Sequence, residues 1–251
     1  QYVKGYGYYD LFLISAEGNV VYTQSKEADL GGNVKTGSLK SSGLGKLFSK
    51  AMQKSSIVDF EPYAPSNGDQ SAFIGAPVVH NGHTIGVVAL QMPTGPINEI
   101  VQRRDGMNKS AENYLVGKLN GVTAYRSNRV IKNGKIGEPK KGLFINKALD
   151  GESGFAMKTG SNGDLEIVHY DSLSIEGLNW VLIGSASVEE MLSGNKAKEG
   201  EDFFSDYMKI NGYYDIFLIE PSGFIFYSVS REAAYRTNIR SGKFKDSGLG
   251  E

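Results

Sequence analysis

The sequence predicts an α+β fold of two consecutive modules, each an antiparallel sheet flanked by helices, followed by the start of a third homologous module. Three observations support this prediction: short strands separated by glycine turns, amphipathic helices between them, and an internal repeat. Glycine accounts for 32 of 251 residues, about twice the usual share of roughly 7%. Hairpin turns are too short for parallel crossovers, so we expect antiparallel sheets.

The first module has the order β-β-α-β-β-β. Its later strands are joined by Asn67-Gly68 and Asn81-Gly82, residue pairs that accept the positive φ values of tight hairpins. Apolar side chains at helical spacing predict a helix over residues 45–54. The expected strands are 10–14, 20–23, 57–63, 70–79 and 84–91.

The second module follows a connecting helix that we expect to start at Pro96 and to end near Gly106. Its polar segment 132–141 predicts a solvated loop, and 143–149 predicts a small helix. The expected strands are 113–116, 122–126, 155–159, 165–170 and 179–185. The resulting domain boundaries are 1–105, 106–192 and 193–251.

An internal repeat connects the two ends of the chain. Gly7 to Ile14 returns as Gly212 to Ile219, and Ser42-Gly43-Leu44-Gly45 returns as Ser247-Gly248-Leu249-Gly250. Aligned without a gap, residues 2–46 and 207–251 are nearly half identical, which indicates homology. A helix is predicted over 202–210, ahead of the second copy. Since the second copy stops where the first continues, we interpret the chain as a fragment.

Composition excludes several classes of function. Lys and Arg total 27 against 28 for Asp and Glu, so no basic field favours nucleic acid. The chain contains no cysteine, which removes disulfides, thiolate metal sites and cysteine nucleophiles. No stretch approaches the roughly 20 apolar residues that a membrane-spanning helix needs. We expect no metal and no cofactor.

Several motifs together resemble the double-Cache family of sensor domains. The resemblance extends over about residues 2–192, and residues 207–251 resemble the opening of another such sensor. The matching segments are Tyr9-Asp10-Leu11-Phe12-Leu13-Ile14, Lys26-Glu27-Ala28-Asp29, Ser42-Gly43-Leu44, Tyr63-Ala64-Pro65-Ser66, Ile85-Gly86-Val87-Val88-Ala89-Leu90-Gln91, Glu112-Asn113-Tyr114-Leu115-Val116-Gly117 and Gly177-Leu178-Asn179-Trp180-Val181-Leu182-Ile183.

This resemblance implies an extracytoplasmic, periplasmic sensor region of an inner-membrane receptor. Parent proteins of this family are chemoreceptors, histidine kinases and cyclic-dinucleotide enzymes. The first module would be the membrane-distal one and would bind a small molecule without transforming it, whereas the second would be membrane-proximal. Homodimerisation is left open. The alternative is a structural or dimerisation module of such a receptor that binds nothing.

Five residues of the first module are candidate ligand contacts: Tyr63, Gln91, Ser66, Phe73 and Glu61. Pockets need apolar walls with a few fixed polar groups. Tyr63 lies beside a Pro-Ser loop, and Gln91 ends an otherwise apolar row. Phe73 fits a pocket wall and a core equally well. Alternation along 57–63 places Asp59 and Glu61 on one face, where solvent exposure is the simplest explanation for both.

The sequence departs from amino-acid-binding members of the family at two points. Those members use an Arg-x-Trp-Tyr element and an aspartate at the end of the last strand. Here the only tryptophan is Trp180, in the other module, and Gln91 occupies the aspartate position. An amino acid would lose its charged partners, so we expect a neutral or weakly anionic metabolite.

Other polar residues favour structural roles. His80 and His83 have a metal-like spacing, but Asn81-Gly82 between them predicts a hairpin tip. Only convergence of both histidines with a carboxylate would favour an enzyme. Asp10 and Asp215 begin apolar strands in both copies, which predicts a repeated structural role such as capping a loop.

Overall fold

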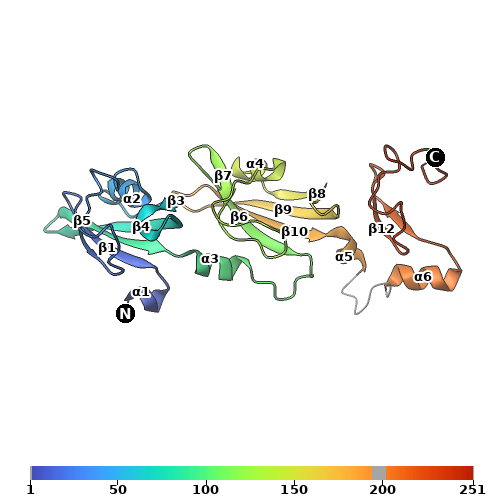
Figure 1. The fold of residues 1–251 in the computed structure, drawn as a ribbon, viewed down its shortest axis with the longest axis horizontal. Helices are drawn as coiled ribbons and strands as arrows, with labels where there is room; N and C mark the ends of the chain where they lie inside the picture. Colours follow the sequence, from blue (N-terminus) through green and yellow to red (C-terminus); the bar gives the residue numbers. More distant parts are fainter. Residues whose placement is uncertain (1, 194–201, 251) are drawn as a thin grey trace. The chain divides into compact units, whose positions relative to one another are not determined.

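The computed structural model describes residues 2–193 and 202–250 (Figure 1). The chain consists of two compact units. One comprises Gln1–Arg103, Asn113–Ser153 and Tyr170–Ile183. The other comprises Arg104–Glu112, Gly154–His169 and Gly184–Glu251. The sequence-derived boundaries at 105 and 192 stay a prediction. No helix among the described residues is long and apolar enough to cross a membrane.

The first sheet has five strands in the order β2-β1-β5-β4-β3. All its pairings are antiparallel, as the hairpin turns predict. At the tip between β4 and β5, Asn81 and Gly82 have φ values of 49° and 76°. The first-module elements are α1 (Tyr2–Tyr6), β1 (Asp10–Ser15), β2 (Val20–Thr23), α2 (Gly43–Ala51), β3 (Ser56–Tyr63), the 3-10 helix η1 (Ala64–Ser66), β4 (Asp69–His80) and β5 (His83–Met92).

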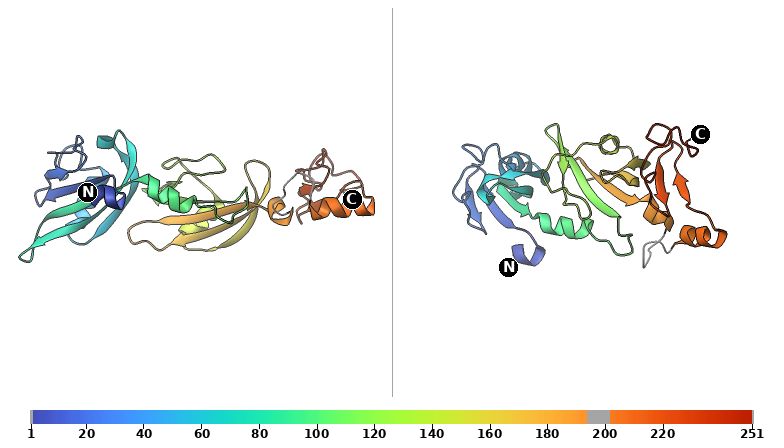
Figure 2. Two further views of the ribbon diagram at one scale, coloured as in Figure 1. Left: turned by 90° about the horizontal axis from the view of Figure 1, so that it is seen from below. Right: turned by 45° about the vertical axis from the view of Figure 1, so that its right-hand side comes forward.

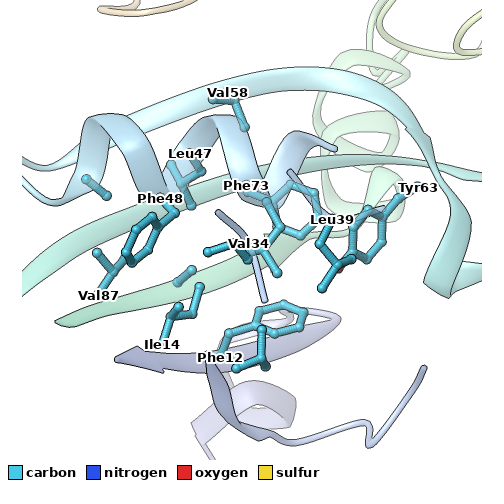
Figure 3. Packing of buried hydrophobic residues seen from close by; sticks show 14 residues of the cluster. Phe12, Ile14, Val34, Leu39, Leu47, Phe48, Val58, Tyr63, Phe73 and Val87 are labelled. Carbon is cyan, nitrogen blue, oxygen red and sulfur yellow. The ribbon is translucent and has the colours of Figure 1, made fainter. Parts of the chain in front are cut away.

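Helix α2 covers one face of this sheet (Figure 3). Its N-terminal cap is Ser42, whose side-chain oxygen accepts a hydrogen bond from the Gly45 amide. Leu44, Leu47 and Phe48 are almost completely buried. Each such side chain contributes about 1.5–3 kcal/mol through removal of apolar surface from water. They pack into one core with residues from every strand of the sheet: Phe12, Ile14, Val20, Val58, Tyr63, Phe73, Val87 and Ala89.

The second sheet also has five strands, in the order β7-β6-β10-β9-β8. Both sheets can be followed from two further directions in Figure 2. The antiparallel order confirms the α+β prediction. The elements of this part are α3 (Thr94–Val101), β6 (Glu112–Leu119), β7 (Val122–Tyr125), α4 (Leu143–Leu149), β8 (Gly154–Thr159), β9 (Leu165–Leu173), β10 (Trp180–Ser187) and α5 (Val188–Ser193).

The connecting helix differs from its prediction. Helix α3 begins at Thr94, with Pro93 as its N-terminal cap, and ends at Val101. The expected start at Pro96 and end near Gly106 are therefore wrong. Proline is accepted within the first turn because the amide that it lacks has no partner inside the helix.

The sequence repeat is also a structural repeat. After α6 (Phe203–Asn211), strands β11 (Phe217–Ile219) and β12 (Ile225–Ser228) form a hairpin. Phe12 pairs with Thr23 in the first copy, and Phe217 pairs with Ser228 in the second. Both hairpins carry a register shift at the same place, before Ile14 and before Ile219. The predicted homology of the two segments is confirmed.

The predicted structural role of the repeated aspartates is confirmed. Asp10 Oδ1 accepts hydrogen bonds from the amides of Leu11 at 2.7 Å and Ser25 at 2.9 Å. Asp215 Oδ1 accepts the equivalent bonds from Ile216 at 2.7 Å and Ser230 at 3.0 Å. In each copy one carboxylate, at the start of β1 or just before β11, ties the chain there to the loop that follows the hairpin.

The expectation for Asp59 is wrong, because this side chain is only 5% exposed. Between Val58 and Glu61 the register of β3 against β4 shifts, since Val58 pairs with Phe73 while Glu61 pairs with Ser71. One extra residue on β3 interrupts the alternation of side chains between the two faces of the strand. The predicted exposure of Asp59 depended on that alternation. As a result Val58, Asp59 and the next residue are all buried.

Candidate functional site

A cavity of about 500 Å³ opens where β4 begins and β5 ends. Ser66, Ser71 and Gln91 line it, together with Asn128, which follows β7. We call it the Gln91 cavity. Its volume lies within the range of roughly 300–1,000 Å³ that is typical of small-molecule sites.

Gln91 is the buried polar group of this cavity, with 3% of its surface exposed. Its Nε2 donates hydrogen bonds to Ser71 Oγ at 2.9 Å and Ser66 Oγ at 3.1 Å. Its carbonyl oxygen Oε1 is buried and accepts no hydrogen bond from the described residues. An unpaired buried acceptor costs about 1–3 kcal/mol, so a residue of the cavity lining carries an unsatisfied polar atom.

Strand register places Gln91 on β5 between β1 and β4. It pairs with Asp10 on β1 and with Phe73 on β4. Ser66 is brought to it by a tight turn after β3, in which Asn67 and Gly68 have φ values of 55° and 81°. Asparagine and glycine are the residues that tolerate this left-handed conformation best.

Glu27 links the Gln91 cavity to the N-terminal hairpin. Its Oε2 accepts a hydrogen bond from Ser66 Oγ at 2.8 Å, and its Oε1 accepts one from the Tyr9 hydroxyl at 2.6 Å. The bond to this carboxylate raises the pKa of Tyr9, because it favours the protonated phenol. The chain of contacts therefore runs from Tyr9 through Glu27 and Ser66 to Gln91.

A second buried pair lies nearby. The Tyr63 hydroxyl donates a hydrogen bond to Asp29 Oδ2 at 2.8 Å, and both residues are fully buried. Burial raises the pKa of Asp29, while the hydrogen bond from Tyr63 acts in the opposite direction. Burial and the neighbouring Asp29 carboxylate raise the pKa of Tyr63 well above its ordinary value.

Tyr63 and Phe73 belong to the core of the first module. Both are 0% exposed, and their rings pack edge to face with centroids 4.9 Å apart. Figure 3 shows them beside Leu39, inside the cluster under α2. Neither residue lines the Gln91 cavity or the larger cavity described next.

Glu61 lies at a different cavity of about 650 Å³, next to the start of α2. Its Oε2 forms an ion pair with Lys46 Nζ at 2.5 Å. Gly37, Ser38 and Ser41 contribute to the same lining. The five candidate residues are therefore divided: Ser66 and Gln91 share one cavity, Glu61 lines another, and the two aromatic residues lie in the core.

Sequence reasoning missed Ser71, Glu27 and Asp29. The repeat contained a usable signal for one of them, because Asp29 aligns with Ala234 whereas Glu27 aligns with Glu232. A buried carboxylate that one copy lacks points to a role beyond the shared hairpin. Ser71 gave no such signal, since it lies beyond the repeated segment.

The histidines have no metal site around them. Asn81 Nδ2 lies 3.2 Å from His80 Nε2 at the exposed hairpin tip. Within residues 2–193 and 202–250, no group of three or more His, Cys, Asp or Glu side chains is placed to hold a metal ion.

The sequence matches no protein-family model, and it matches no curated protein. Solved structures do match. The ligand-binding domain of the Campylobacter jejuni chemoreceptor Tlp3, in complex with 4-methylisoleucine, has a TM-score of 0.54 and 10% identity over 78% of this chain and 71% of that one. The ligand-binding domain of the Pseudomonas aeruginosa PAO1 amino-acid chemoreceptor PctB, in complex with L-Arg, has a TM-score of 0.52 and 13% identity over 78% of each chain.

A third similar structure is the ligand-binding domain of the Pseudomonas fluorescens chemoreceptor CtaA in complex with L-isoleucine. Its TM-score is 0.50, with 16% identity over 76% of this chain and 73% of that one. These identities are low, so the likeness concerns the fold. The chain has the fold of chemoreceptor ligand-binding domains, as its resemblance to double-Cache sensors predicted.

Proposed function

We propose that this chain is the ligand-sensing region of a membrane receptor and that it binds a small polar molecule in the Gln91 cavity. The observation that carries the proposal is the buried, unpaired Oε1 of Gln91, a residue that lines a cavity of ligand size. Buried polar groups are nearly always hydrogen-bonded. A bound molecule with an N–H or O–H donor supplies the bond that the protein does not.

The surrounding residues define the chemistry of the ligand. Ser66 and Ser71 offer hydroxyls beside the Gln91 amide, and none of these three groups carries charge. The charged residues of the lining, Asp69 and Lys135, have opposite signs. The site therefore favours a neutral or weakly anionic metabolite with at least one hydrogen-bond donor. Tyr63 and Phe73 support the strands behind these groups, and Glu61 belongs to the larger cavity.

The fold suggests the setting of this binding event. The neighbours are ligand-binding domains of chemoreceptors, which favours an extracytoplasmic region whose parent is anchored in the inner membrane. Residues 1–105 would form the distal, binding module and 106–192 the proximal one. The same resemblance favours output through chemotaxis, a histidine kinase or a cyclic-dinucleotide enzyme, and a homodimer stays one possible assembly.

One observation favours a second candidate function. Two of the five expected ligand contacts, Tyr63 and Phe73, fill the core. A module filled by its own side chains acts as a spacer or a dimerisation element and binds nothing. The two functions differ in whether any compound stabilises the folded chain.

Thermal unfolding against a library of neutral metabolites, organic acids and amino acids tests the proposal. A compound that raises the melting temperature is then titrated into the Gln91→Ala and Ser66→Ala variants. Loss of one hydrogen bond predicts a dissociation constant about tenfold weaker. Gln53→Ala, a change at an exposed glutamine outside both cavities, is the control and should bind normally.

Two outcomes contradict the proposal. A stabilising compound that binds Gln91→Ala and Ser66→Ala with unchanged affinity shows that the site lies elsewhere. A complete absence of stabilising compounds favours the spacer function.

A further inference from the structure

Asp59 is a buried carboxylate whose side-chain partners come from the second module. Its Oδ1 accepts hydrogen bonds from Arg126 Nε at 2.7 Å and Trp180 Nε1 at 2.8 Å. Its Oδ2 accepts a bond from Arg126 Nη2 at 2.7 Å. The side chains of this ion pair are only 3% and 4% exposed. We call these three residues the Asp59 contact.

The geometry of the contact leaves little freedom. The Phe60 amide donates a further bond to Asp59 Oδ1 at 2.7 Å, and the Phe60 ring stacks on Trp180 with centroids 6.0 Å apart. Arg126 Nη1 donates to the carbonyl oxygens of Ala124 and Tyr125, the last two residues of β7. A bidentate guanidinium–carboxylate pair with its remaining groups satisfied holds one orientation.

Each half of the contact lies close in sequence to one wall of the Gln91 cavity. Asp59 is on β3, which ends at Tyr63 and leads directly into η1 with Ser66. Arg126 is two residues before Asn128. Ser66 and Asn128 both line the cavity, one from each module. The Asp59 contact therefore ties together the two segments that supply these walls.

The second-module wall is itself fixed. The Asn128 amide donates to Asn98 Oδ1 at 2.7 Å, and Gln102 Nε2 donates to the Asn128 carbonyl at 3.1 Å. Asn128 Oδ1 accepts a bond from the Ile136 amide at 3.0 Å. A displacement of this wall is accordingly shared with α3 and with the segment after β7 that carries Arg126.

We propose that the Asp59 contact couples the Gln91 cavity to the second module, with Asp59 as the positioning residue. A change at the cavity shifts η1 and the end of β3. The ion pair passes that shift to Arg126, directly after β7, and the hydrogen bond of Trp180 passes it to the start of β10. This inference deepens the proposed function, and it rests on that function for the signal that is transmitted. The coupling itself requires no ligand.

A purely stabilising ion pair would give a different result. Removal of such a pair makes the whole chain less stable, but it does not change how one region responds to a perturbation in another. The test must therefore compare a response at the second module with and without the Asp59 contact.

Hydrogen exchange of the full chain provides this comparison. Gln91→Ala is the perturbation at the cavity, and the readout is the exchange of amides in residues 113–128 relative to those in α2. In the wild-type background we expect Gln91→Ala to change this exchange by about threefold or more. In the Asp59→Asn background the same substitution should leave the segment unchanged.

The fluorescence of Trp180 gives a second readout, since the chain contains one tryptophan. Gln91→Ala should shift its emission in the wild-type background and not in Asp59→Asn. The matched control is Glu176→Gln, which removes an exposed ion pair between the same modules, Lys54 to Glu176 at 2.6 Å. Both responses should persist in that background.

An equal response to Gln91→Ala with and without Asp59 overturns the proposal, as does its loss in the Glu176→Gln control. If Asp59→Asn does not fold, Trp180→Phe removes one donor and keeps the ion pair. It should lower the exchange response to about half, and an undiminished response overturns the proposal equally. No ligand is added in this test. The coupling can therefore be disproved while the binding experiment succeeds, and the coupling can be supported while the binding experiment fails.

Discussion

The two copies of the repeated segment share their hydrogen bonds but differ in what their loops contact. In the first copy the Tyr9 hydroxyl donates to Glu27, and in the second the Tyr214 hydroxyl donates to Glu232. The bonds of the strand-initial aspartates are repeated as well. Features present in both copies are those that the hairpin needs in order to fold.

The loop after the hairpin has diverged. In the first copy it carries Asp29, which is bonded to Tyr63 within the core. In the second copy Tyr235 and Arg231 of the same loop contact Glu189 on α5, at 2.5 Å and 2.7 Å. One loop scaffold thus serves an internal contact in one copy and a docking contact in the other. Differences between copies mark the residues with a local task.

The largest expected difference concerns equivalent phenylalanines. Phe12 is 0% exposed in a complete core, so Phe12→Ala should destabilise the chain by about 3–5 kcal/mol. Phe217 is only half-buried, and Phe217→Ala should cost about 1 kcal/mol or less. Urea unfolding, followed by the fluorescence of Trp180, measures the first effect. Equal costs would show that the second hairpin has a core as complete as that of the first.

The equivalent aspartates, Asp10 and Asp215, should differ less than the phenylalanines in how much their removal destabilises the chain. Asp10→Ala removes bonds from Leu11, Ser25 and the buried Thr23 hydroxyl, at a cost of about 2–3 kcal/mol. Asp215→Ala in the partly exposed second copy should cost about 1 kcal/mol. Local hydrogen exchange of each hairpin separates the two effects. A larger loss for Asp215 would contradict the assignment of the first copy as the better packed one.

The contact of Arg231 and Tyr235 with Glu189 in the second copy should contribute less to stability than either aspartate does. Arg231 is 43% exposed in its ion pair with Glu189, and exposed pairs contribute about 0.2–1 kcal/mol. Tyr235→Leu introduces the residue type that the first copy carries at Leu30. It should raise amide exchange in α5 by about threefold or less. Leu30→Tyr, at a side chain that is 45% exposed, should leave the chain unchanged.

The smallest expected effect is the contribution of Asp29 to the pH dependence of stability. Burial raises the pKa of Asp29, so the folded chain binds this proton more tightly than the unfolded chain does. Its contribution to stability is therefore complete below about pH 4 and is lost as the pH rises through the raised pKa. Asp29→Asn should flatten the dependence of the urea midpoint on pH in that window. Asp69→Asn, at an exposed carboxylate, should leave the wild-type slope intact.

The strands and most helices could be predicted because their signals are local. Alternating apolar residues, turns such as Asn81-Gly82 and the spacing of Leu44, Leu47 and Phe48 require no knowledge of distant partners. The internal repeat added an independent check on the first hairpin. The structural role of Asp10 followed from that repetition alone.

The site was harder to predict because its contacts join distant segments. Ser66, in the Pro-Ser loop, and Gln91, at the end of a strand, are candidates from the sequence, and they do share a cavity. Tyr63 could not be placed, since nothing in the sequence shows that Asp29 accepts its hydroxyl within the core. Asp59 was misplaced because a bulge shifts the alternation of β3 by one residue, and a bulge leaves no signal in a single sequence.

Gly45 on α2 has a consequence for finding relatives of this unit. A side chain there would collide with the carbonyl oxygens of Leu39 and Lys40, and at Gly250 it would meet those of Phe244 and Lys245. The carbonyl groups of Leu39 and Lys40 lie so close to Gly45 that no larger residue fits there. This restriction does not depend on the ligand that a homologue recognises. A search for further copies is therefore best anchored on the Ser-Gly-Leu-Gly stretch, because strand residues can be exchanged for other apolar ones and this glycine cannot.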